Sequence, residues 1–423
     1  MSEQEFPSAA VLAETFVSRS HVAWFAEDVY VFNYASGVYE KKSREWLEHV
    51  VLLFLKESVG AQNVSAALVT GVCRAIKNSV YLDEHHHPPL WIATQKRADV
   101  FVTGNGIVSI EAIANGTSPV LRPHTPDLFA VCGVPYKFDF AAQCPKWLEF
   151  VRWMVAGNEG EVRLIQQFCA WVFIAIWLKL EKILWLCGPG GNGKSTFLLI
   201  IRWVLGEGAT SAVGLDAFQG GSTFRLWPTV YRLANFCLDA VVKKKSDVAT
   251  LNSFVSGDCF TINRKFREQL TIEPSTVCFF ASNQLPLLDD PSDAFWRRLL
   301  LIRCEQRLSE EQINPTLISE LKKEAPGILN WMLAALPGLM ERRRFEIPES
   351  VRRNVENLKA EVNSVRQFLN EKVEAGDRLD FMSRDRFMEA YGQWCRLNLV
   401  KEEAFDVVKQ EMRCDTPGLS AWN

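Results

Sequence analysis

The most informative stretch of the sequence is Gly188-Pro189-Gly190-Gly191-Asn192-Gly193-Lys194-Ser195-Thr196. It matches the pattern G-x-x-x-x-G-K-[S/T] at every fixed position. The apolar run at residues 183–186 predicts a buried strand before it, and residues 197–204 predict a helix after it. A glycine-rich turn can match the pattern by chance, but the flanking strand and helix favour a phosphate-binding loop, or P-loop.

The spacing of this loop has a direct chemical meaning. Its glycines allow successive backbone N–H groups to face one concave surface, beside the positive end of the following helix. We therefore expect residues 188–196 to hold the phosphates of ATP. In such a loop Lys194 reaches the β- and γ-phosphates and Ser195 binds Mg²⁺.

The composition indicates a folded chain of more than one domain. Its 423 residues are enough for two or three domains, and a hydrophobic content of 48% with 27 Phe and 14 Trp supports large buried cores. The formal net charge is −3, so any contact with nucleic acid must come from a local basic patch. The 11 cysteines form no C-x-x-C pair, which is typical of reduced thiols.

The sequence shows no sign of an export or membrane segment. Its first residues lack the basic and apolar parts of a signal peptide. The longest apolar run, residues 168–178, is too short to cross a bilayer. We therefore expect a cytoplasmic protein without a membrane partner.

The N-terminal part mixes strand and helix patterns and shows no catalytic motif. Residues 29–34 and 36–39 predict a hairpin, residues 43–58 a helix, and residues 104–106 a tight turn. From residue 144 to 178 the pattern becomes helical and predicts two helices that lead into the strand before the loop. Their apolar stripes consist of Trp147, Phe150, Val151 and Met154, and of Val162, Ile165, Phe168, Cys169, Val172 and Phe173.

The histidine triplet at residues 85–87 raises the question of a metal site. It lies in a polar stretch beside Pro88 and Pro89, without a second pair of ligands at a suitable spacing. We therefore expect an exposed loop there and no metal.

Polar side chains follow two further strand candidates. Residues 233–238 end at Asp239, which suits a Walker B carboxylate that holds Mg²⁺ or orients water, although a strand followed by Asp is common. Residues 275–282 end at Asn283, which can contact the γ-phosphate or begin a turn before Pro286.

Two basic groups lie close to these strands. Arg297 and Arg298 precede the apolar run at residues 299–302 and suit an arginine finger supplied by a neighbouring subunit, or else an ordinary surface ion pair. Residues 261–262 and 270–272 can pair as a hairpin. Its tip carries a basic cluster around an aromatic ring, which suits contact with single-stranded DNA or is simply a solvated turn: Arg264, Lys265, Phe266 and Arg267.

Several motifs together carry a family resemblance. The wording at residues 188–196 is accompanied by Ser-Gly-Asp at 256–258, Arg-Lys-Phe at 264–266, Phe-Ala-Ser-Asn-Gln-Leu-Pro at 280–286, Ala-Phe-Trp-Arg-Arg at 294–298, and further matches at 124–127, 144–145, 326–331, 342–345 and 391–395. The chain thus resembles superfamily 3 helicases, in particular the helicase part of the primase-helicases of satellite phages, poxviruses and other mobile elements. The match covers nearly the whole chain but is loose over the first ~90 residues.

The resemblance implies an AAA+-like ATPase that forms a ring, a hexamer, and moves 3′ to 5′ along single-stranded DNA. It implies that the hairpin lines the channel and that Arg297 or Arg298 reaches the ATP of a neighbouring subunit. The sequence departs from the family pattern in two places. Asp239 is a single carboxylate where the family usually has two acidic residues, so Asp258 or Asp216 could contribute. In addition, no primase-like Asp-x-Asp site precedes the core. The chain is then either a stand-alone helicase, with a primase or polymerase acting in trans, or a fragment of a longer protein.

We expect an α/β protein with five parts. Residues 1–143 form a mixed α+β domain, 144–180 a helical connector, 181–305 an AAA+-like P-loop ATPase core, 306–360 a helical follow-on, and 361–423 a small, mainly helical domain for which a winged-helix-like fold is one option. The expected function is an ATP- and Mg²⁺-dependent helicase acting on single-stranded or forked DNA. The alternatives are an ATP-switched initiator or loader that does not unwind DNA processively, and a small-molecule kinase, which the extra domains and the hairpin disfavour.

Overall fold

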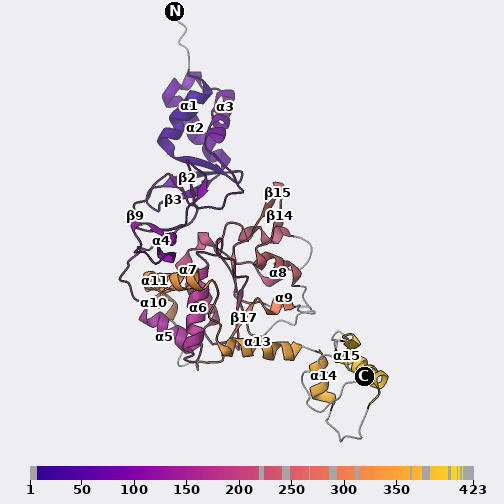
Figure 1. Cartoon of the computed structure of the whole chain (residues 1–423). Coiled ribbons are helices and arrows are strands. Elements are labelled where there is room, and N and C mark those ends of the chain that lie inside the picture. Colours follow the sequence, from indigo (N-terminus) through magenta and orange to yellow (C-terminus); the bar gives the residue numbers. More distant parts are fainter. Residues whose placement is uncertain are drawn as a thin grey trace, which may run out of the picture.

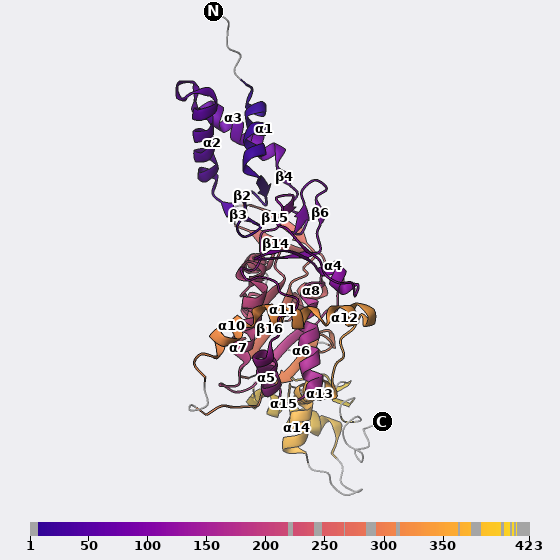
Figure 2. The same cartoon turned by 90° about the vertical axis from the view of Figure 1, so that its left-hand side faces the viewer.

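The computed structural model places three groups of elements along one axis. It describes residues 7–218, 223–240, 248–265, 267–284, 293–309, 314–362, 364–373, 382–398, 402–406, 408–409 and 412. The N-terminal helices lie at one end, a helix-covered sheet lies in the middle, and the last helices lie at the other end (Figure 1). The quarter-turn view shows the same order (Figure 2).

The N-terminal end consists of three helices packed on a four-stranded sheet. The helices are α1 (Ala9–Ser20), α2 (Arg44–Val59) and α3 (Ala66–Ser79), and the sheet has the order β3 (Val38–Lys42), β2 (Asp28–Asn33), β1 (Val22–Phe25), β4 (Tyr81–Leu82). Each helix begins after a serine whose hydroxyl accepts a backbone N–H, a standard N-cap: Ser8, Ser43 and Ser65. The expected hairpin and the helix at residues 43–58 are confirmed.

Two small three-stranded sheets connect this end to the middle. One contains β5 (Leu90–Trp91), β6 (Lys96–Arg97) and β10 (Leu128–Phe129). The other contains β7 (Val100–Thr103), β8 (Gly106–Ser109) and β9 (Leu121–Arg122). The short helix α4 (Ile110–Ala114) follows β8. The predicted tight turn at residues 104–106 joins β7 to β8.

The histidine triplet differs from expectation in one residue. His85 and His86 are exposed, as expected. His87 is half-buried, with Nδ1 at 2.9 Å from the guanidinium of Arg97, and burial lowers its pKa to about 3. The ring is therefore neutral at pH 7 and belongs to the packing between the small sheets and Tyr231.

The middle of the chain is a five-stranded parallel sheet. Its order is β12 (Thr210–Ser211), β13 (Ala234–Cys237), β16 (Val277–Ser282), β11 (Ile183–Cys187), β17 (Leu299–Arg303), and all neighbours are parallel. Every residue of β11, β13 and β16 is buried, which explains why these strands appear in the sequence as continuous apolar runs. The structure confirms four predicted strands: β11 before the loop, β13 before Asp239, β16 before Asn283 and β17 after Arg298.

Two hydrophobic cores cover the faces of this sheet. Phe279 of β16 points into one core and Phe280 into the other, as the alternation of a strand requires. The first core includes α5 (Pro145–Met154), α6 (Glu159–Trp171), α7 (Lys194–Leu205), α10 (Leu317–Lys323), α11 (Ala325–Leu333) and α12 (Leu336–Arg342). The second includes η3 (Leu215–Phe218), η4 (Thr223–Thr229), α8 (Ala249–Ser256), α9 (Asp293–Trp296) and α13 (Glu349–Val362). Both predicted stripes at residues 147–173 are buried in the first core.

The C-terminal end is helical where the structure describes it. α14 (Ser364–Lys372) and α15 (Arg384–Asn398) pack around Phe368, Tyr391 and Trp394. The described residues beyond Ser364 contain no strand, so they give no support to a winged-helix-like fold.

The described residues show neither a disulfide bond nor a membrane-spanning helix. All the cysteines among the described residues carry free thiols, in line with the expectation of reduced cysteines. Within the same residues, no helix combines the length and the apolar character needed to cross a membrane.

Replacing Trp147 with alanine should destabilise the middle of the molecule. Its ring is fully buried and stacks on Phe197 with 5.4 Å between ring centroids, so Trp147→Ala should cost about 3–5 kcal/mol and lower the melting temperature. Phe140→Ala is the control, because that ring is 52% exposed. Equal shifts in thermal unfolding for the two variants would contradict the assigned core.

Candidate functional site

The glycine-rich loop joins β11 to α7 at the carboxyl edge of the sheet. Gly188 has φ 154°, and a Cβ there would lie 2.1 Å from the carbonyl oxygen of Cys304. Gly193 has φ 82°, and a Cβ there would lie 2.9 Å from the ring of Phe150. Both positions therefore require glycine, for the backbone angle and for the space.

Lys194 begins α7 and places its ammonium group at the centre of the loop. The side chain is buried, and Nζ donates to the carbonyl of Gly188 at 2.5 Å, to Oδ1 of Asn192 at 2.8 Å and to the carbonyl of Pro189 at 3.0 Å. Oδ1 of Asn283 lies 3.5 Å from the same nitrogen. Burial lowers the pKa of Lys194, whereas these oxygen acceptors favour the charged form.

The remaining loop residues brace the loop or leave it open. Asn192 is buried and its Nδ2 donates to the carbonyl of Cys304 at 2.5 Å, so its side chain is structural. At Gly190 and Gly191 a Cβ would meet no atom within 4 Å, so the space beside the loop is open. Ser195 is exposed in the first turn of α7, followed by the half-buried Thr196.

Asp239 and Asn283 follow strands that end at the same edge as the loop. β16 lies directly beside β11, with Ser282 paired to Cys187, which brings Asn283 to Lys194 as the sequence suggested. Asp239 is exposed after β13, which is separated from β11 by β16. It therefore lies two strand spacings, about 10 Å, to the side of the loop strand.

A second carboxylate lies near Asp239. Burial raises the pKa of the Cys237 thiol, and the negative charges of Asp239 and Asp216 add to that shift. Asp216 also forms a 2.6 Å ion pair with Arg225. The sequence offered Asp216 beside Asp258 as a possible second carboxylate, but the short η3 segment carries no periodic pattern that would place it.

Asp258, the other carboxylate considered, lies at the opposite edge of the sheet. It follows Gly257, whose carbonyl accepts a hydrogen bond at 2.9 Å from Lys179, just before β11 begins. This placement separates it from the loop of the same chain by the length of the strand.

Arg297 and Arg298 lie at that opposite, amino edge of the sheet. The backbone N–H of Ile183 donates to the carbonyl of Arg298 at 2.8 Å where β11 and β17 begin. Because the strands between have five residues, the loop lies about 16 Å away. Neither arginine can therefore reach the loop of its own chain.

The two arginines differ in their surroundings. The Arg298 side chain is 6% exposed and donates to Glu181 at 2.7 Å and to Oγ of Ser256 at 2.5 Å. The Arg297 side chain is 66% exposed and lies 3.9 Å from Glu181. Arg298 is thus a structural ion-pair partner, whereas Arg297 is the accessible cation.

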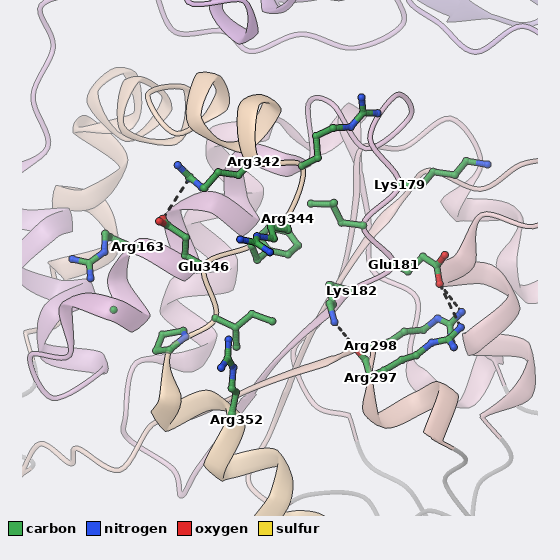
Figure 3. Close-up of a pocket in the computed structure, with 16 residues that line it drawn as sticks. Arg163, Lys179, Glu181, Lys182, Arg297, Arg298, Arg342, Arg344, Glu346 and Arg352 are labelled. Atoms are coloured by element: carbon green, nitrogen blue, oxygen red, sulfur yellow. Dashed lines mark hydrogen bonds and ion pairs between the residues drawn. The ribbon is translucent and has the colours of Figure 1, made fainter.

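Arg297 belongs to a strongly basic pocket (Figure 3). The pocket has a volume of about 890 Å³, and Glu181 and Glu346 are its acidic residues. Its basic residues are Arg163, Lys179, Lys182, Arg297, Arg298, Arg342, Arg343, Arg344 and Arg352. Burial and then the neighbouring Arg298 and Arg297 lower the pKa of Lys182, which reflects this excess of positive charge. The run at residues 342–344 was the sequence signal for this pocket, but nothing in the sequence placed it beside Arg297.

The basic hairpin is confirmed, but its arginines are not free at its tip. β14 (Phe260–Arg264) pairs with β15 (Arg267–Ile272). Arg264 is 5% exposed and binds both carboxylate oxygens of Glu84, at 2.9 and 3.1 Å. Arg267 donates to the carbonyl of Ala26 at 2.8 Å and lies 3.3 Å from Asp28.

These contacts correct the expectation of an exposed basic tip. Acidic groups of the N-terminal part neutralise Arg264 and Arg267, because folding brings the hairpin against that part. Lys265 lies at the turn, and the predicted contact residue Phe266 falls outside the residues that the structure describes.

Comparison with known proteins shows that the fold has been seen before. A family of unknown function, DUF5906, matches residues 186–298. The A-form apo structure of the C-terminal region of NrS-1 superposes with a TM-score of 0.55 at 12% identity, covering 96% of this chain and 93% of that one. A second A-form apo structure of that region gives a TM-score of 0.53 at 11% identity, covering 96% and 94%. The chain therefore shares its mixed α/β fold with this region over nearly its whole length.

Replacing Gly188 should damage the loop, whereas replacing Gly190 should not. Gly188→Ala forces a Cβ against Cys304 at a positive φ and should cost about 1–3 kcal/mol of stability. Gly190→Ala adds the same methyl group into open space. Thermal unfolding of both variants measures the difference, and equal melting temperatures would contradict the assigned loop geometry.

Proposed function

We propose that the chain is an ATP-dependent DNA helicase with an AAA+-like P-loop core, which acts as a hexameric ring on single-stranded or forked DNA. The observation that carries the proposal is the loop at residues 188–196 between β11 and α7, with Lys194 at its centre and Asn283 beside it. This arrangement suits the recognition of a nucleoside triphosphate.

The residues around the loop fit ATP and Mg²⁺. The open space at Gly190 and Gly191 gives room for phosphates, and the first turn of α7 and the Lys194 ammonium supply positive charge. Ser195 and Asp239 would hold Mg²⁺, with Asp216 as the second carboxylate on that side of the site. Mg²⁺ would offset the charge of the phosphate oxygens.

The chain's own groups would then divide the work. Lys194 exchanges its bonds to the loop carbonyls for phosphate oxygens, and the Asn283 amide orients the terminal phosphate or a water molecule. Asp239 would orient the attacking water, a role that its exposure at the same edge of the sheet supports.

The position of Arg297 supports an assembly of several copies. It lies at the amino edge of the sheet, exposed and surrounded by other cations, where it cannot reach its own loop. Head-to-tail interfaces join two different surfaces of the same chain, and in the proposed ring the amino edge of one subunit would face the carboxyl edge of the next. Arg297 would then stabilise negative charge on the neighbour's nucleotide.

An initiator or loader that uses ATP as a switch is the alternative. Two observations favour it: Asp239 is a single carboxylate at the end of its strand, and the hairpin arginines are held by Glu84 and Asp28. A hairpin fixed in this way moves less readily with each round of hydrolysis than one with a free base.

Mixing two inactive variants should restore ATP hydrolysis if the site is shared between subunits. Lys194→Ala and Arg297→Ala should each abolish DNA-stimulated hydrolysis, and an equal mixture should recover about a quarter of wild-type activity, because about a quarter of the interfaces combine an intact Lys194 with an intact Arg297. Arg353→Ala, exposed on α13 outside the basic pocket, is the control. A mixture as inactive as its components would rule out a shared site.

A forked DNA substrate separates the helicase from the loader. The helicase should release the labelled strand with ATP and Mg²⁺, and Lys194→Ala should release none because the loop loses its cation. DNA-stimulated hydrolysis without strand release would favour the loader. Hydrolysis that does not respond to DNA would contradict both.

A further inference from the structure

The basic pocket at the amino edge of the sheet holds more positive charge than an arginine finger needs. The described residues that line it include nine cations and two carboxylates, around a volume of about 890 Å³ that suits a small ligand. Figure 3 shows Arg297 beside Glu181 on one side of the pocket, and Arg163, Arg344 and Arg352 on the other. The proposed role of Arg297 leaves this second arginine group unexplained.

Both carboxylates of the pocket already have partners outside the second arginine group. Glu181 accepts a hydrogen bond from Arg298 at 2.7 Å. Glu346 lies 3.4 Å from Arg342 and accepts Nε2 of Gln167 at 2.5 Å. The positive charge of the second group is therefore not offset by the acidic residues of the pocket.

The second group lies where the helix dipoles favour an anion. Arg163, Arg344 and Arg352 are exposed, and their side chains form no ion pair with any residue that the structure describes. Arg344 follows the end of α12, where a cation is favourable, but Arg163 lies near the start of α6 and Arg352 in the first turn of α13. Gly160 and Pro348, at the starts of these two helices, also line the pocket. Two positive helix ends and three unpaired guanidinium groups therefore surround one space.

The elements that carry these arginines are fixed to one another. Oγ of Ser350 donates to Glu161 at 2.6 Å and accepts Nδ2 of Asn158 at 3.0 Å, which ties the start of α13 to the start of α6. The backbone N–H of Glu346 donates to Oε1 of Gln167 at 3.0 Å, which ties the segment after α12 to α6. The backbones that present the cations are thus held together before a ligand arrives, and such preorganisation lowers the cost of binding.

We propose that Arg163, Arg344 and Arg352 bind a small ligand that carries a chain of phosphate groups, either an inorganic polyphosphate or a nucleotide. The three guanidinium groups come from three separate segments of the chain. A phosphate chain offers charged oxygens on several sides, whereas a carboxylate accepts one guanidinium fork in its plane. The site lies at the amino edge of the sheet and is separate from the loop at residues 188–196.

Titration calorimetry with sodium tripolyphosphate tests this site, in a Lys194→Ala parent chain whose loop lacks its cation. The parent should bind tripolyphosphate. Arg344→Gln or Arg352→Gln, added to the parent, should each weaken binding about tenfold, because each removes a charge-assisted hydrogen bond to phosphate. Combining both with Arg163→Gln should abolish measurable binding. Tripolyphosphate should also raise the melting temperature of the parent but not of the combined variant, because only the parent binds it in the folded state.

Arg353→Gln is the matched control, because it removes the next charge along α13, exposed but outside the pocket. It should bind tripolyphosphate like the parent. Binding of ATP more tightly than tripolyphosphate, lost in the combined variant, would identify a nucleotide as the ligand, and equal or weaker binding of ATP would identify the inorganic chain.

Three results would overturn the proposal: no binding of tripolyphosphate to the parent, unchanged affinity of the Arg344→Gln and Arg352→Gln variants, or tighter binding of sulfate or of a glutamate peptide than of tripolyphosphate. Because the parent lacks Lys194, none of these results depends on whether the chain hydrolyses ATP.

Discussion

The carbonyl oxygen of Cys304 is the point on which the candidate site depends. Cys304 follows β17, and its backbone N–H donates to the carbonyl of Cys187 at 2.7 Å. The carbonyl of Cys304 accepts a hydrogen bond from Nδ2 of Asn192 and packs against Gly188. The end of one strand thus sets the shape of the loop that follows its neighbour. A side chain at Gly188 cannot fit, and without the Asn192 bond the loop would lose its brace on that side.

The parallel sheet then determines what each edge can do. All five strands run in the same direction, so the loop, Asp239 and Asn283 gather at the carboxyl edge, while Arg297 and the basic pocket gather at the amino edge. The loop at the carboxyl edge and the cations at the amino edge therefore cannot contact each other within one chain.

The sequence predicted those features that depend on local patterns. Residues 183–186 and 275–282 were recognisable because strands buried on both faces are continuously apolar. Residues 188–196 were recognisable because a tight turn with positive φ angles needs glycine at fixed positions. The contact of Asn283 with Lys194 followed once β16 was placed beside β11.

Features made by distant segments could not be predicted in the same way. Asp216 reaches the end of β13 from a 3₁₀ segment without a periodic pattern, and the basic pocket collects residues from 163 to 352. Arg264 was expected at the tip of a basic hairpin, in contact with DNA or in a solvated turn. Its actual surroundings are set by Glu84, which no local pattern links to it.

That ion pair also bears on how the chain is made. Arg264 lies 180 residues after Glu84, so a ribosome adding roughly 5–20 residues per second needs about 10–40 seconds to deliver the arginine. During this interval the Glu84 carboxylate stays hydrated, and the face that later meets the hairpin stays open to water. The joint between the two parts therefore cannot form until synthesis has passed Arg264.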